Sequence, residues 1–177
     1  MNIKRCIVGY LQTNCYLLFK DDEVLIIDPG DEFDLIDEAI GNYNVSGVLI
    51  THSHDDHTGA LDDLVNKYKC AVYDKTNLKE GNNTISNYNF KVIYTPGHID
   101  DEVVYYFEKD KVMFVGDFIF KDSIGRMDLP GGNSKDMKDS LLNIINYPKD
   151  TIIYPGHGDS TTLDDELDNL NYYINIL

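Results

Sequence analysis

The chain has 177 residues, 31 of them acidic and 15 basic, and a formal net charge of −16. This balance argues against a nucleic-acid partner, which needs a cationic surface; no Lys or Arg occurs between Lys20 and Lys67. The length fits one domain, residues 1–177, and no apolar run is long enough to cross a bilayer. The first ten residues lack the pattern of a secretory signal, so we expect a cytoplasmic protein without membrane contact. Its oligomeric state is left open.

Short β-rich runs alternate with amphipathic stretches in the first half. Residues 14–20 and 23–27 flank the turn-like pair Asp21 and Asp22 and predict a hairpin. Apolar residues at helical spacing predict a helix over 32–43, with Asp31 placed to cap its start. The remaining elements expected in this half are a strand at 47–50, a helix with Leu61, Leu64, Val65 and Tyr68 facing inward, and a strand at 71–73.

The second half repeats the alternation. Strands are expected at 90–94, 102–107, 111–115 and 151–154, and helices at 137–145 and 163–176. Strands interspersed with helices in both halves predict a layered α/β sandwich in which helices cover sheet faces. Strand order does not follow from the pattern. The cysteines Cys6, Cys15 and Cys70 match no zinc-binding spacing and are expected to be buried free thiols.

The five histidines of the chain all fall where a predicted strand ends, a position at which folds commonly place functional side chains. They are His52, His54 and His57 in THSHDDHTGA, His98 in TPGH and His157 in PGHG. In an extended segment, alternate residues point the same way, so His52 and His54 can reach one point together.

A turn into a helix near Asp56 would aim Asp56 and His57 at a second point close by. Neutral imidazole and carboxylate suit Zn²⁺, Fe²⁺ and Mn²⁺. Asp117 follows a strand and a glycine; alone it suggests a turn, but beside these histidines it is a candidate bridging anion between two cations.

Five segments resemble the successive metal-site motifs of the metallo-β-lactamase superfamily: IIDPG, THSHDDHTG, TPGH, VGDFIF and PGHG. They occur in the order of that family, from Asp28 to His157. The resemblance implies an αββα sandwich of two similar halves, with helices outside and two mixed sheets inside. It implies two divalent metal ions, zinc in the first place, with iron or manganese as alternatives.

The ligands implied by the resemblance divide into two sets. His52, His54 and His98 would hold one ion, Asp56, His57 and His157 the other, and Asp117 would bridge them. Asp28 resembles an aspartate that supports the ligands from behind.

The stretch GDFIFKDSIGRMDLPGG, residues 116–132, resembles that of short glyoxalase II-like hydrolases. This implies hydrolysis of a small-molecule thioester or ester, with Asp56 orienting the nucleophilic hydroxide and Arg126 binding substrate. Arg126 paired with Asp122 or Asp128 is the alternative. The acidic segment after His157 lacks the basic glutathione-binding residues of longer enzymes, which leaves the substrate open, and Asp100 and Asp101 have no assigned role.

Two other functions share the motifs. A mononuclear iron persulfide dioxygenase would use His52, His98 and Asp117, and a metal-binding module would have no turnover.

Overall fold

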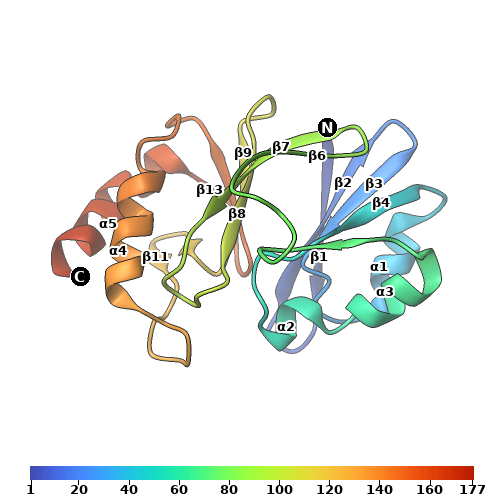
Figure 1. Cartoon of the computed structure of the whole chain (residues 1–177), viewed down its shortest axis with the longest axis horizontal. Coiled ribbons are helices and arrows are strands. Elements are labelled where there is room, and N and C mark those ends of the chain that lie inside the picture. Colours follow the sequence, from blue (N-terminus) through green and yellow to red (C-terminus); the bar gives the residue numbers. More distant parts are fainter.

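Two β-sheets face each other in the middle of the molecule, and helices cover their outer faces (Figure 1). The computed structural model describes residues 1–177. The first sheet has the order β1-β2-β3-β4-β5 and belongs to the first half of the chain. Its strands are β1 (Asn2–Val8), β2 (Thr13–Lys20), β3 (Glu23–Ile27), β4 (Asn44–Leu49) and β5 (Val72–Tyr73). The pairs β1/β2 and β2/β3 are antiparallel, whereas β3/β4 and β4/β5 are parallel.

The second sheet has the order β13-β12-β9-β8-β7-β6. It contains β6 (Gly81–Ile85), β7 (Tyr88–Tyr94), β8 (Val103–Phe107), β9 (Val112–Gly116), β12 (Ile152–Pro155) and β13 (Thr161–Thr162). Only the β12/β9 pair is parallel. A separate short hairpin, β10 (Ile119–Phe120) with β11 (Ser123–Ile124), follows β9. Both sheets are therefore mixed, as the resemblance implied.

Five helices complete the sandwich: α1 (Phe33–Ile40), α2 (Asp55–Thr58), α3 (Leu61–Tyr68), α4 (Ser134–Ile144) and α5 (Leu163–Ile176). In Figure 1, α1 and α3 lie outside the first sheet, and α4 and α5 lie outside the second. The helices turn one apolar face to the sheets, since Ile36 and Ile40 of α1 and Leu141 and Ile144 of α4 recur at helical spacing and are fully buried. The predicted layered α/β sandwich is confirmed.

Three apolar clusters separate the four layers. The cluster between the sheets is rich in aromatic rings, among them Tyr16, Tyr105 and Phe114. The side chains of α1 and α3 join one flanking cluster, and those of α4 and α5 join the other. All three cysteines are free, and Cys6 and Cys15 are buried in the cluster next to α1 as predicted, but Cys70, just after α3, is only half-buried. Burial on both faces explains why central strands such as β3 and β9 are almost wholly apolar.

Several boundaries differ from the predictions. The helix expected over 32–43 ends at Ile40, because Gly41 adopts φ 62° and closes the helix onto Asp37. Asp31 is not its cap; Glu32 holds that position, in a left-handed conformation and without a side-chain capping bond. Helix α4 begins before 137, since the Asn133 side chain accepts from the backbone N–H groups of Lys135 and Asp136. Strands β1 and β6 and the two-residue strands β10, β11 and β13 were not predicted.

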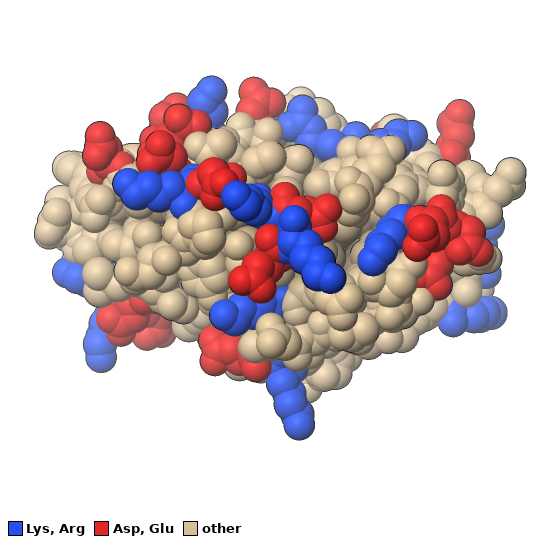
Figure 2. All heavy atoms as spheres, turned by 90° about the horizontal axis from the view of Figure 1, so that it is seen from above, with Lys and Arg blue, Asp and Glu red and all other residues tan.

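The surface carries both signs of charge. On the face seen in Figure 2, acidic and basic side chains are interspersed, although acidic residues outnumber basic ones in the whole chain. None of the helices has the length and apolar content needed to cross a membrane.

Candidate metal centre

The five histidines gather in one place although they are spread over 106 positions of the chain. His52, His54 and His57 follow β4, His98 follows β7, and His157 follows β12. Three groups of candidate ligand atoms form, each with all its atoms within 4.8 Å of one another. The groups are His52 with His54 and His98; His52 with His57 and Asp117; and Asp56 with His57 and His157.

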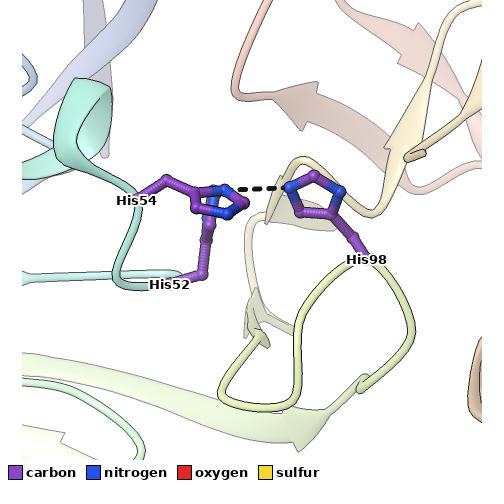
Figure 3. A group of neighbouring side chains, drawn as sticks. All are labelled: His52, His54 and His98. Atoms are coloured by element: carbon purple, nitrogen blue, oxygen red, sulfur yellow. Dashed lines mark hydrogen bonds between the residues drawn. The ribbon is translucent and has the colours of Figure 1, made fainter. Parts of the chain in front are cut away.

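The first group brings ligands from both sheets together. Figure 3 shows His52 and His54 on the loop after β4 facing His98 on the loop after β7. His98 Nε2 lies 3.1 Å from His54 Nδ1. Tetrahedral Zn²⁺ with Zn–N bonds of about 2.0 Å places neighbouring nitrogens about 3.3 Å apart, so these two atoms are spaced as ligands of one ion.

A second set of ligands, Asp56 with His57 and His157, contains the two residues that the turn into α2 directs at the cluster. His157 Nε2 lies 3.2 Å from Asp56 Oδ2, and His57 Nε2 lies 3.6 Å from the same oxygen. The four-residue helix α2 carries Asp56 and His57, in agreement with the turn expected near Asp56. The intervening Ser53 and Asp55 are exposed.

Asp117 faces both the set of His52, His54 and His98 and the second set. Its Oδ1 lies 3.4 Å from His57 Nε2, and its Oδ2 lies 3.5 Å from His157 Nε2 and 3.8 Å from His98 Nε2. The sequence placed this carboxylate between two ions, and the structure puts it in a position from which it reaches candidate ligands of each.

Asp28, in IIDPG, orients two of the imidazoles from behind. Its Oδ2 accepts from His57 Nδ1 at 2.9 Å and from the Thr51 hydroxyl at 2.7 Å. Because Thr51 gives its proton to Asp28, its Oγ1 is left to accept from His52 Nδ1 at 3.1 Å. Both rings then present Nε2, with its lone pair, to the cluster.

Backbone carbonyls orient two more rings. His98 Nδ1 donates to the carbonyl of Arg126 at 2.7 Å, and His157 Nδ1 donates to that of Leu11 at 3.1 Å. Four imidazoles are thus held through Nδ1 and offer Nε2. His54 differs, since its Nδ1 faces the cluster.

The residues fit divalent metal ions. Nε2 of His52, Nε2 of His57 and Oδ1 of Asp117 are buried and have no hydrogen-bond partner. Buried polar atoms are normally paired, so three orphans converging on one point need a ligand. Imidazole nitrogens and carboxylate oxygens are the donors that Zn²⁺, Fe²⁺ and Mn²⁺ accept.

The electrostatics of the cluster follow from burial and close opposite charges. Burial lowers the pKa of His52 well below its usual value. Burial also disfavours charged His57, but Asp28 and Asp117 outweigh it and raise the pKa of His57 to about 10. The contact with His157, aided by Thr13, lowers the pKa of Asp56 to about 2. Protons and metal ions therefore compete for the same atoms.

Two glycines allow the loops to close on one another. A Cβ on Gly30 would lie 1.8 Å from the carbonyl oxygen of Asp56, and one on Gly156 would lie 2.3 Å from Asp117 Oδ1. The first contact brings the IIDPG loop against α2, and the second brings PGHG against Asp117. Any side chain at either position would displace a candidate ligand.

Three residues of the site were missed in the sequence. Thr13 donates its hydroxyl to Asp56 Oδ2 at 3.0 Å, and Thr51 links Asp28 to His52. Glu102 is fully buried, and its Oε1 accepts from the Asp117 backbone N–H at 2.8 Å. Burial and Asp117 raise the pKa of Glu102 well above its usual value. The only signal in the sequence was an acid at the start of an apolar strand.

The remaining residues singled out earlier lie around the cluster. The Arg126 guanidinium pairs with the Asp128 carboxylate through two bonds of 2.7 and 2.8 Å, while its carbonyl holds His98. Asp100 accepts from Lys75 through its backbone carbonyl. Asp101 lines a cavity of about 120 Å³ beside His52.

Comparison with known proteins agrees with this geometry. The sequence profile described as "Metallo-beta-lactamase superfamily" matches residues 8–78 and 85–157. The chain is 32% identical to a hydroxyacylglutathione hydrolase of Francisella philomiragia, over 89% of this chain and 68% of that protein.

Two solved structures resemble the whole chain. BLEG-1, described as a B3 metallo-beta-lactamase, has a TM-score of 0.92 at 31% identity, and the match covers 97% of this chain and 99% of that one. TTHA1623, solved in a di-iron-bound form, has a TM-score of 0.86 at 30% identity and covers 94% of this chain and 98% of its own. On the matched profile, the relatives and the cluster of histidines and aspartates, the chain belongs to the metallo-β-lactamase superfamily.

Proposed function

We propose that this protein hydrolyses thioesters or related esters with two divalent metal ions. The observation that carries the proposal is the position of Asp117, whose two oxygens face candidate ligands of both groups. The similarity to a hydroxyacylglutathione hydrolase supports a thioester, and the di-iron form of TTHA1623 supports two ions.

Each of the two sets of ligands would bind one ion. His52, His54 and His98 would hold one ion, Asp56, His57 and His157 the other, and Asp117 both. Zinc is the first expectation, with iron or manganese as alternatives. When bound, such ions supply Lewis acidity, which brings the pKa of water toward neutrality and stabilises negative charge on a carbonyl oxygen.

The side chains position the reactants. Asp56 is a carboxylate at neutral pH and can accept a hydrogen bond from the attacking water, while its Oδ2 also accepts from the Thr13 hydroxyl. The water oxygen bonds to the carbonyl carbon and releases a proton to solvent, the carbon–sulfur bond breaks, and the sulfur leaves as a thiolate that takes up a proton from solvent. A thiolate is a good leaving group, so no strong protein acid is required.

Arg126 is a substrate-binding candidate by its position near His98. Its guanidinium already forms a two-bond pair with Asp128, so a substrate carboxylate would have to replace that partner.

Metal content and activity test the proposal together. Protein purified without added metal is expected to hold two ions per chain and to hydrolyse S-lactoylglutathione or acyl-N-acetylcysteamine. Asp117→Ala should lower the thioesterase rate about 100-fold or more and lower the metal content. Asp168→Ala, which removes an exposed carboxylate on α5, should leave both unchanged.

Two results would overturn the assignment. One iron per chain with persulfide-dependent uptake of O₂ would indicate the dioxygenase. Tight metal binding with no turnover of thioesters, esters or a β-lactam panel would leave a metal-binding module.

A further inference from the structure

A cavity of about 300 Å³ opens beside the metal cluster, between the turn after β1 and the start of α2. Thr13 and Asp56, which are bonded to each other, lie on its wall, and so does Leu11, whose carbonyl holds His157. A group lying in the cavity is therefore within contact of a candidate ligand.

The turn that forms one wall exposes apolar side chains. Tyr10 is 96% exposed and Leu11 is 58% exposed, although both are large enough to stabilise a core. An amphipathic tyrosine with no covering neighbour beside a reactive site is typical of ligand contact, because the ring provides apolar area at low entropic cost. The cavity wall thus offers apolar contact that the rest of the fold leaves unused.

Charge around the cavity disfavours an anion. Asp31, Asp55 and Asp56 line it, and no Lys or Arg does. Arg126 is paired with Asp128, and Arg5 is bonded to the carbonyl of Gly158. Lys121 lines a different cavity, next to His157. A substrate group carrying a carboxylate would meet repulsion in this cavity without a compensating cation.

We propose that this cavity is the subsite for an uncharged, apolar substituent of the thioester. The proposal rests on the proposed hydrolase function and deepens it. The enzyme selects neutral, apolar thioesters, and Tyr10 is the main apolar contact. Thioesters with carboxylates on either side of the carbonyl, including those of glutathione, are the poorer substrates.

Four matched thioesters test the selection: hexanoyl and succinyl groups, each on N-acetylcysteamine and on glutathione. Hexanoyl-N-acetylcysteamine should have the highest kcat/KM, by about tenfold over its anionic counterparts. Tyr10→Ser should raise KM for this substrate about tenfold with kcat little changed, whereas Tyr10→Phe should restore KM. Tyr172→Ser, at another exposed tyrosine, is the matched control.

Charge variants give an independent readout. Asp31→Asn and Asp55→Asn together should raise kcat/KM for the glutathione thioester several-fold, and 0.5 M salt should shrink the gain. A preference for anionic thioesters that Lys121→Ala removes would overturn the proposal, as would an unchanged KM in Tyr10→Ser.

Failure of the proposed function is distinguishable. If the wild type hydrolyses none of the four substrates, the hydrolase is wrong. The cavity is then tested alone by calorimetric titration with the thioether analogue of hexanoyl-N-acetylcysteamine, in which CH₂ replaces the carbonyl. Binding weakened in Tyr10→Ser supports the subsite, and equal or absent binding rejects it.

Discussion

Glu102 connects the start of β8 to the loop that carries Asp117. It is fully buried, and its Oε1 accepts the Asp117 N–H, while its second oxygen has no partner. Its Oε1 is also 3.9 Å from His52 Nδ1. A single buried side chain thus lies against two candidate ligands and belongs to none of the three groups of ligand atoms, which makes it a positioning residue.

Replacing Glu102 separates positioning from simple packing. Glu102→Leu leaves the Asp117 N–H without an acceptor, so we expect zinc affinity to fall about 10-fold to 100-fold. Glu102→Gln keeps an oxygen acceptor and should stay within about threefold of wild type. Competition with a chromophoric chelator measures the affinity.

Glu166 provides the matched control, because it is equally buried and accepts from the Asp122 N–H and the Thr161 hydroxyl, neither of which belongs to a candidate ligand. Glu166→Leu should lower the free energy of unfolding without changing zinc affinity. Equal losses of affinity in the two leucine variants would contradict a specific role for Glu102.

At the scale of elements, α1 and α3 are joined by one carboxylate. Asp37 of α1 accepts from Lys67 and from the hydroxyl of Tyr68, both on α3. The bond to Lys67, followed by that to Tyr68, lowers the pKa of Asp37 below its usual 3.8. A lowered folded-state pKa stabilises the fold at pH values above the unfolded-state pKa, and this stabilisation is lost as the pH falls through the folded-state pKa.

Asp37→Asn should therefore lower the free energy of unfolding by about 0.5 to 1 kcal/mol at pH 7. The difference from wild type should shrink once the pH falls below about 4. Urea titrations across this range measure it. Glu38→Gln, one position along the same helix and exposed, should show no such dependence; a difference that stayed constant with pH would count against the ionised link.

The sequence predicted the elements with two buried faces or a clear apolar stripe, and missed those at the edges. Strand β1 was missed because Lys4, Arg5 and Ile7 are all exposed, so the run lacks a buried pattern. Strand β6 is an edge strand rich in Asn. Helix α1 was overextended because apolar spacing continues past Gly41, and only its backbone conformation ends the helix.

The site residues likewise divide into those that the sequence predicted and those that it missed. Every histidine was recognisable as a residue at a strand end, and the structure brings all five together with Asp117. Glu102 and Thr51 were not recognisable, because their roles depend on which backbone or side chain lies opposite in the folded chain. The pairing of Arg126 with Asp128 was foreseen only as an alternative.

At the scale of the molecule, the candidate ligands connect the two sheets. His52, His54 and His57 follow a strand of the first sheet, whereas His98, Asp117 and His157 follow strands of the second. Bound ions would therefore act as cross-links between the layers, and their binding free energy would add to the stability of the sandwich.

Metal removal should lower the melting temperature of the whole protein. Ions present at about 1,000 times Kd contribute about 4 kcal/mol, which corresponds to a Tm shift of about 10 °C for a chain of this size. Differential scanning calorimetry before and after chelation, and after adding zinc back, measures the shift. Asp117→Ala should show a much smaller response, and an unchanged Tm in the chelated wild type would exclude a stabilising ion.

The contact between β2 and the end of β12, with the loop that follows it, lies directly beside the cluster. The Asn14 side chain donates to the carbonyls of Pro155 and Gly158, and the Tyr16 hydroxyl also donates to Pro155. These partners are about 140 positions apart in the chain. Since long loops close slowly, the second ligand group is expected to assemble late in folding. His52, His54 and His98 also precede His157 in the chain, so during synthesis the first ligand set is present before the second can be complete.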